Sequence, residues 1–115
     1  MSKRKFVFFL DDILESINKI EEYTCDLAYE EFEINFEKQD AVYRRLEIIG
    51  EAVKHVPAEI RHQFPDVPWQ EVAGLRDVII HNYFGLVPKR VWNVLHTDLP
   101  KFKQQMEEVR RSINE

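Results

Sequence analysis

The chain has 115 residues, of which 44% are hydrophobic and 32% charged, a composition that fits one globular domain spanning residues 1–115. Its three glycines and five prolines disfavour a turn-rich all-β design, and its formal net charge of −5 excludes a broad nucleic-acid-binding face. Residues 1–40 hold eleven acidic residues against five Lys or Arg. Any phosphate site farther along the chain would therefore be local, built from a few arginines.

The first predicted element is an amphipathic helix over residues 6–24. Its apolar side chains recur at helical spacing, with acids and a lysine on the opposite side. The residues of this stripe are Phe6, Phe9, Leu10, Ile13, Ile17, Ile20 and either Tyr23 or Thr24. We expect the helix to continue to about Glu30. The segment EEFEINFEKQ (30–39) alternates charged and apolar residues, which predicts a connection.

A second long helix is predicted from about Asp40, where DAVYRRLEIIGEAVKHV returns to helical period. Gly50 lies inside this helix. Because an interior glycine costs about 1 kcal/mol relative to alanine, its presence predicts a close approach by another helix. Pro57 ends the helix and opens a short one, PAEIRHQF.

The rest of the chain is divided by Pro68, Pro88 and Pro100 into three further predicted helices. The first runs from Trp69 to about Phe84, the next is PKRVWNVLHT, and the last begins near Thr97 or Asp98. The expected architecture is all-α, an antiparallel bundle of four to six helices with two long helices and shorter ones.

Cysteine usage and the opening residues bear on the compartment. A single cysteine, Cys25, excludes an internal disulfide and is typical of a reduced, buried intracellular thiol. The opening MSKRKFVFFLDD has too short an apolar run for a signal peptide, and no run approaches the length of a membrane span. We expect a cytoplasmic protein that does not associate with membranes.

Residues 75–83, LRDVIIHNY, interrupt an apolar helical segment with polar groups. Asp77 and His81 are four positions apart, so the carboxylate could hydrogen-bond or ion-pair with the imidazole and hold its tautomer. Arg76 and Tyr83 are seven apart and lie on the same side of a helix, two turns from each other. The segment is therefore a candidate site.

Arg76 and His81 diverge by about 140° on an ideal helix. They could meet at one ligand if the helix end unwinds before Gly85, or if a two-fold related copy faces this helix. Metal-independent RNA cleavage needs a base for the 2′-hydroxyl, an acid for the leaving 5′-oxygen and positive charge on the phosphorane. Two copies supply that set, whereas one chain supplies half of it.

Structural roles for the same residues stay open at this level. Arg76 and Asp77 are compatible with a solvated helix face, His81 with a structural histidine and Tyr83 with a half-buried anchor. Three further histidines form no ligand cluster, so neither a metal nor a cofactor is expected; they are His55, His62 and His96. Both tryptophans, Trp69 and Trp92, are more typical of packing anchors than of base-stacking platforms.

The pattern R-x4-H-x-Y, present as Arg76, His81 and Tyr83, resembles the signature of the HepT-like toxins of the HEPN superfamily. The stretch RRLEIIGEAVKHVP resembles the second long helix of that family. PWQEVAGLRDVIIHNYFGLVPKRVW resembles its motif region through to the following tryptophan helix. The resemblance covers most of the chain, although the first 35 residues match only as an acidic amphipathic helix.

This resemblance implies a function and a site. HEPN proteins are α-helical and dimerise so that two motifs face one cleft, and many are metal-independent endoribonuclease toxins. By this implication His81 is the general acid and base, Arg76 stabilises the phosphate in the transition state, and Asp77 and Asn82 give polar support. RNA would be the substrate and the protein would be a homodimer.

The resemblance also implies a partner. The usual partner of the family is a small nucleotidyltransferase antitoxin of the MntA type, which transfers AMP from ATP to the motif tyrosine, here Tyr83. An alternative is a non-catalytic subunit that binds nucleotide or docks a nucleotidyltransferase, with Arg76 merely holding a phosphate. A third hypothesis is a helical interaction protein without chemistry.

Overall fold

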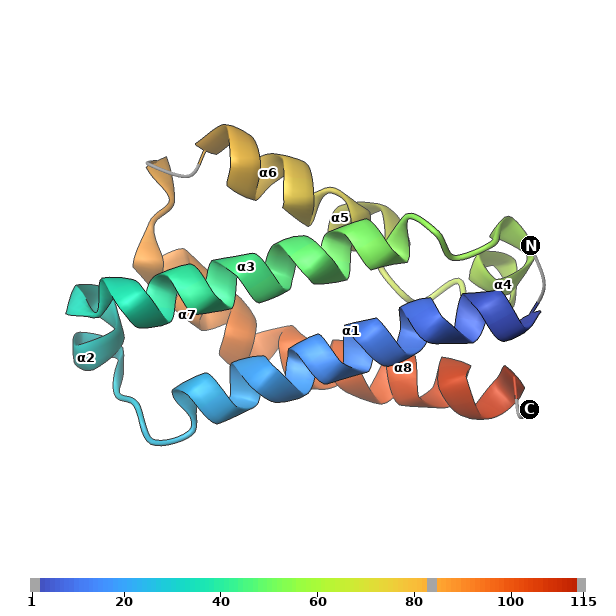
Figure 1. The fold of residues 1–115 in the computed structure, drawn as a ribbon, viewed down its shortest axis with the longest axis horizontal. Helices are drawn as coiled ribbons and strands as arrows, with labels where there is room; N and C mark the ends of the chain where they lie inside the picture. The colour runs from blue at the N-terminus through green and yellow to red at the C-terminus, as the bar shows by residue number, and fades with distance from the viewer. Residues whose placement is uncertain (1–2, 83–84, 114–115) are drawn as a thin grey trace.

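A computed structural model describes residues 3–82 and 85–113 of the chain. Its helices are α1 (Lys3–Thr24), α2 (Tyr29–Ile34), α3 (Phe36–Val53), α4 (Ala58–Gln63), α5 (Trp69–Ala73), α6 (Leu75–Asn82), α7 (Pro88–Thr97) and α8 (Leu99–Ile113). The long helices α1 and α3 pack side by side and run antiparallel, α8 packs along α1, and α6 lies on α3 (Figure 1). The all-α antiparallel bundle is confirmed.

The predicted apolar stripe of α1 forms the centre of the core. Five of its members are at most 1% exposed: Phe6, Leu10, Ile13, Ile17 and Ile20. Burying one such side chain stabilises the fold by about 1.5–3 kcal/mol, so this stripe fixes how α1 faces α3 and α8. Phe9, at the edge of the stripe, is only partly buried, which leaves part of its ring near the surface.

The segment between the two long helices differs from the prediction. Helix α1 ends at Thr24 rather than near Glu30, and the expected connection contains α2 and the first turn of α3. Asn35 is the reason that α3 begins at Phe36 rather than at Asp40, because its Oδ1 accepts a hydrogen bond of 2.9 Å from the backbone N–H of Lys38. This N-cap satisfies a donor that the helix start would otherwise leave free.

Gly50 confirms the predicted close approach between helices. A Cβ atom at this position would lie 2.9 Å from the backbone nitrogen of Arg76 and 3.0 Å from the carbonyl oxygen of Val72. Both neighbours are backbone atoms, which cannot rotate away. The glycine therefore lets the junction of α5 and α6 rest directly on α3.

The predicted helix from Trp69 to Phe84 is divided at Gly74 into α5 and α6. The N–H of Gly74 caps α5 by donating to the carbonyls of Gln70 and Val72. The indole of Trp69, which is 7% exposed, donates a 2.9 Å hydrogen bond to the carbonyl of Phe64 and so anchors the start of α5. The predicted end at Phe84 lies outside the described residues.

Two other predictions meet different outcomes. Cys25 is exposed, so the expected core thiol is wrong; the residue follows the end of α1, where its Sγ lies 3.5 Å from the carbonyl of Glu22. Trp92 is a packing anchor as predicted, with its ring centroid 5.2 Å from that of the buried Phe32.

Within residues 3–82 and 85–113, no helix has the length and apolar character needed to cross a membrane.

Candidate functional site on helices α3 and α6

Helix α6 carries the predicted site residues on the surface of the molecule. Arg76, Asp77, His81 and Asn82 are all exposed, while Ile79 is 3% exposed and holds the helix against α3. The fifth predicted site residue, Tyr83, lies outside the described residues. The described site residues are thus accessible to a large substrate such as a polymer.

Two carboxylates hold the guanidinium of Arg76. Its Nε lies 3.4 Å from Oε2 of Glu51 on α3, and its Nη1 lies 3.2 Å from Oδ1 of Asp77. All three side chains are between 44% and 53% exposed. Because exposed ion pairs contribute about 0–1 kcal/mol, these carboxylates orient the guanidinium weakly and can be exchanged for a phosphate.

Asp77 does not make the contact with His81 that its spacing predicted. It faces two cations instead, with Oδ1 3.2 Å from Nη1 of Arg76 and 3.8 Å from Nζ of Lys54, the residue that follows α3. Both residues lie in the described part of the chain, and no hydrogen bond or ion pair joins Asp77 to His81 there. Two permanent positive charges attract the carboxylate more strongly than an imidazole four positions along the same helix.

The backbone of α6, as far as Asn82, bears on one of the two ways of bringing Arg76 and His81 together. The helix is continuous from Leu75 to Asn82, so it does not unwind between these two residues. On one helix they diverge by about 140°. Unwinding before residue 82 is therefore excluded, and the second possibility, a two-fold related copy, stays a prediction.

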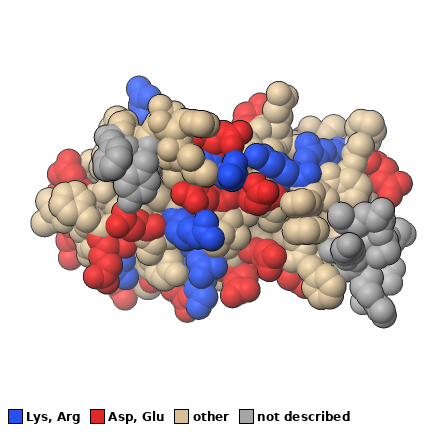
Figure 2. Space-filling view, turned by 45° about the horizontal axis from the view of Figure 1, so that its top comes forward, with Lys and Arg blue, Asp and Glu red and all other residues tan. Residues whose placement is uncertain are grey.

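A hollow of about 210 Å³ lies beside Arg76, between α1, α3 and α6. Its polar lining consists of Asp12, Arg44, Glu47, Glu51, His55 and Arg76. Over α3 and α6, acidic and basic side chains are interspersed, so the site is not a continuous basic field (Figure 2). This surface agrees with the prediction that a phosphate site would be built from a few arginines rather than from a broad basic face.

Sequence reasoning missed Glu51 and His55 as neighbours of the candidate site. The imidazole of His55 stacks on the ring of Phe9, with centroids 4.3 Å apart and planes 7° from parallel, and its Nε2 lies 4.0 Å from Oε1 of Glu51. The available signal was their spacing, since positions 44, 48, 51 and 55 share one face of a helix. Which helix would cover that face could not be read from the spacing.

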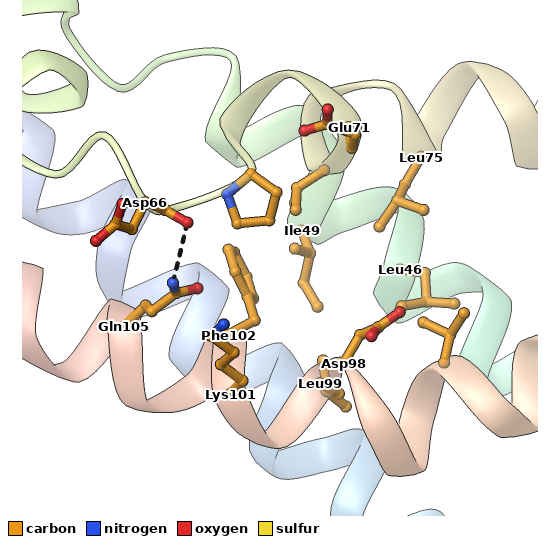
Figure 3. A pocket seen from close by; sticks show the side chains of 13 residues that line it. Leu46, Ile49, Asp66, Glu71, Leu75, Asp98, Leu99, Lys101, Phe102 and Gln105 are labelled. Carbon is orange, nitrogen blue, oxygen red and sulfur yellow. Dashed lines mark hydrogen bonds between the residues drawn. The ribbon is translucent and has the colours of Figure 1, made fainter.

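A second, larger hollow of about 510 Å³ opens on the other side of the start of α6. Figure 3 shows its mostly apolar walls, to which Leu46, Ile49 and Phe102 contribute, and the hydrogen bond of 3.3 Å from Nε2 of Gln105 to the carbonyl of Asp66. Leu75 lines this hollow, whereas the next residue, Arg76, lines the smaller one. None of the four predicted site residues that the structure describes contributes to its wall.

Comparison with known proteins shows the family to which the chain belongs. The family model described as Ribonuclease HepT-like matches residues 13–109, and the chain therefore belongs to the HepT-like family. It is 47% identical, over 93% of its length, to a candidate RNase of Methanocaldococcus jannaschii, of which it covers 98%. It is 40% identical, over 95% of its length, to a probable ribonuclease HepT of Thermococcus cleftensis, of which it covers 99%.

One relative has a second activity in its name. A Methanocaldococcus jannaschii protein named as a gamma-glutamylcyclotransferase and candidate RNase is 44% identical over 92% of this chain, which covers 50% of that protein. No solved structure matches the chain significantly. The family resemblance drawn from the motif residues is thus confirmed by relatives that match almost the whole chain.

Proposed function

We propose that the protein is an endoribonuclease toxin that cleaves RNA as a homodimer without a metal ion. Family membership and the ribonuclease names of its relatives support the activity. The observation that carries the proposal is the pair of exposed residues Arg76 and His81 on one helix, with the guanidinium held, among the described residues, by exposed carboxylates. Such a guanidinium can bind a phosphodiester that arrives from solvent.

The proposed reaction needs one histidine from each copy. His81 of one copy takes the proton from the 2′-hydroxyl as the 2′-oxygen bonds to phosphorus. The bond from phosphorus to the 5′-oxygen then breaks, and that oxygen receives a proton from His81 of the second copy. The guanidinium of Arg76 stabilises the negative charge that develops on the phosphorane, while Asp77 orients Arg76 and Asn82 gives polar support.

Apolar groups on α6 favour the dimer. Val78 and Ile80 are 49% and 47% exposed and flank the charged residues of this helix. The two positions are two residues apart, so they lie at opposite edges of the exposed face of α6, with Asp77 and His81 between them. A second copy of α6 would cover them and would bring the two His81 side chains to one cleft.

We further propose that a nucleotidyltransferase antitoxin of the MntA type neutralises the toxin by transferring AMP to Tyr83. The support is the sequence spacing, because residues 76 and 83 are two helical turns apart. An adduct that carries phosphate would add negative charge near Arg76 and compete with RNA for the guanidinium.

The alternative is a non-catalytic subunit that binds nucleotide or docks a nucleotidyltransferase. The net charge of −5 and the carboxylates of Glu51 and Asp77 favour it, because both weaken the attraction of a polyanion. In that case Arg76 would hold a phosphate and His81 would have no chemical role.

Cleavage of a labelled RNA in the presence of EDTA tests the proposal against this alternative. The wild-type protein, expressed without a nucleotidyltransferase, should cut the RNA and leave 2′,3′-cyclic phosphate ends. His81→Ala should lower the rate by at least about a hundredfold, because general acid–base catalysis is lost. His62→Ala removes another exposed histidine, on α4, and should leave the rate unchanged. A wild-type protein that cuts no RNA would favour the non-catalytic subunit.

Intact-mass measurement tests whether a nucleotidyltransferase transfers AMP to Tyr83. Co-expression with the cognate nucleotidyltransferase should add whole AMP units to the wild-type chain and none to Tyr83→Phe. Tyr29→Phe, which changes a tyrosine on α2, should still be modified. Modification of Tyr83→Phe at the wild-type level would mean that another residue receives the AMP.

A further inference from the structure

We propose that the hollow between α1, α3 and α6 binds a single nucleobase that carries an exocyclic amino group, with the phosphate of that nucleotide at Arg76. This inference rests on the proposed function and deepens it, because it assigns a base preference to the same site. The hollow measures about 210 Å³, below the 300–1,000 Å³ typical of sites for larger ligands. It has room for one ring system beside the guanidinium.

The stacked pair of Phe9 and His55 provides the platform for the base. Their planes are 7° from parallel with centroids 4.3 Å apart, so Phe9 covers one face of the imidazole. The side chain of His55 is nevertheless 44% exposed. Aromatic and histidine rings commonly stack on the bases of single-stranded RNA, and the uncovered face of His55 offers such a surface.

The charges that line the hollow favour binding of a base inside it over binding of a phosphate. Three carboxylates line it, on Asp12, Glu47 and Glu51, against the two guanidinium groups of Arg44 and Arg76. Arg44 is already paired with Glu47, with 3.1 Å between Nη1 and Oε2. A carboxylate-rich interior disfavours a phosphate and favours a ligand that donates N–H groups, such as the amino group of cytosine, adenine or guanine.

Glu51 lies between the platform and the phosphate position. Its Oε1 is 4.0 Å from Nε2 of His55, and its Oε2 is 3.4 Å from Nε of Arg76. A phosphate that binds Arg76 would compete with Glu51 for the guanidinium. The carboxylate so released would accept a hydrogen bond from the amino group of a base stacked on His55. One nucleotide would therefore give hydrogen-bond partners to both the guanidinium of Arg76 and the carboxylate of Glu51. Uracil has no exocyclic amino group and would be a poorer partner for Glu51.

Titration of 5′-AMP and 5′-UMP into labelled protein, followed by NMR of the His55 ring, tests this subsite without relying on cleavage. AMP should shift the His55 ring signals and bind about tenfold more tightly than UMP. His55→Ala should weaken AMP binding about tenfold, whereas His55→Phe should retain it because the stacking surface remains. His62→Ala is the matched control and should bind AMP as the wild type does.

Equal binding of UMP and AMP, or wild-type AMP binding by His55→Ala, would overturn the subsite. A short RNA that binds more tightly than AMP and is displaced by it would identify an RNA nucleotide as the ligand. Tighter binding of AMP than of the RNA would identify a free nucleotide instead, and either result supports the subsite. A protein that binds AMP in this way and yet cuts no RNA would keep the subsite and lose the proposed nuclease function.

Discussion

At the scale of single residues, Gly50 links the fold to the candidate site. The absence of a side chain at this position allows the backbone of Arg76 to lie against α3. The same contact brings the guanidinium within 3.4 Å of Glu51, the residue that follows the glycine. The position of the arginine therefore depends on the space left by a neighbouring glycine.

Gly50→Ala should destabilise the protein by about 1–3 kcal/mol, because the added Cβ meets backbone atoms at 2.9 and 3.0 Å. Gly74→Ala is the matched control, since its Cβ would make ordinary contacts of 3.5 Å and its backbone is right-handed helical. That change should stabilise the protein by about 0.4–1 kcal/mol. Urea unfolding followed by circular dichroism measures both, and equal effects of the two substitutions would contradict the argument.

Single-residue predictions from local spacing had limited reach, since the contact predicted between Asp77 and His81 does not form. The exposure of Arg76 and His81 follows from their positions around α6. The partners of Asp77 could not be predicted, because Lys54 approaches it from the end of α3. That contact depends on the register between α3 and α6, which no local pattern encodes.

At the scale of elements, Gln39 joins the short helix α2 to α3. Its side chain is buried, and its Nε2 donates hydrogen bonds of 2.9 Å to the carbonyls of Phe32 and Glu33. These carbonyls lie in the last turn of α2, where carbonyls lack the regular helical donor; that of Phe32 also accepts the backbone N–H of Asn35 at 3.2 Å. A helix of six residues is too short to be stable alone, so it depends on such tertiary contacts.

Gln39→Leu should lower the free energy of unfolding by about 1–3 kcal/mol, because the carbonyl of Glu33 loses the donor from Gln39 and that of Phe32 keeps only the N–H of Asn35, while the side-chain volume is nearly kept. Gln104→Leu makes the same change at an exposed position of α8 and should have little effect. Urea unfolding of the two variants gives the comparison. A loss for Gln39→Leu no larger than for Gln104→Leu would show that α2 is held in another way.

Prediction of the helices from the sequence worked where the apolar period was strong, as in α1, or where a proline marked the helix start, as in α7. The buried stripe of α1 and the whole of α7, which starts at Pro88, are as predicted. It failed around Asn35, because a cap that separates two helices is not visible in a segment of alternating charge. It also failed at Gly74, where packing of the junction on Gly50 divides one predicted helix into two.

At the scale of the whole molecule, exposed apolar groups occur far from each other on the surface. Val78 and Ile80 lie on α6, whereas Ile34 and Phe36 flank the turn between α2 and α3 and are 74% and 72% exposed. The proposed dimer uses only the first pair. The second pair therefore provides an internal control for the effect of removing surface hydrophobicity.

Ile80→Asp should shift the proposed dimer toward monomer, because it places a carboxylate in the apolar part of the interface. Ile34→Asp makes the same substitution at a more exposed position and should leave the dimer intact. Size-exclusion chromatography with light scattering, over a range of protein concentrations, measures the association state. Dissociation by Ile34→Asp alone would assign the interface to the turn between α2 and α3.

The start of α6 is a wall shared by two hollows, since Leu75 faces the larger and Arg76 the smaller. Consecutive Cα atoms are joined by a rigid peptide plane, so a displacement of the Cα atom of Leu75 also displaces that of Arg76. Occupants of the two hollows would therefore not bind independently whenever either of them moves this junction. Thermodynamic reciprocity then requires each occupant to change the affinity for the other by the same factor.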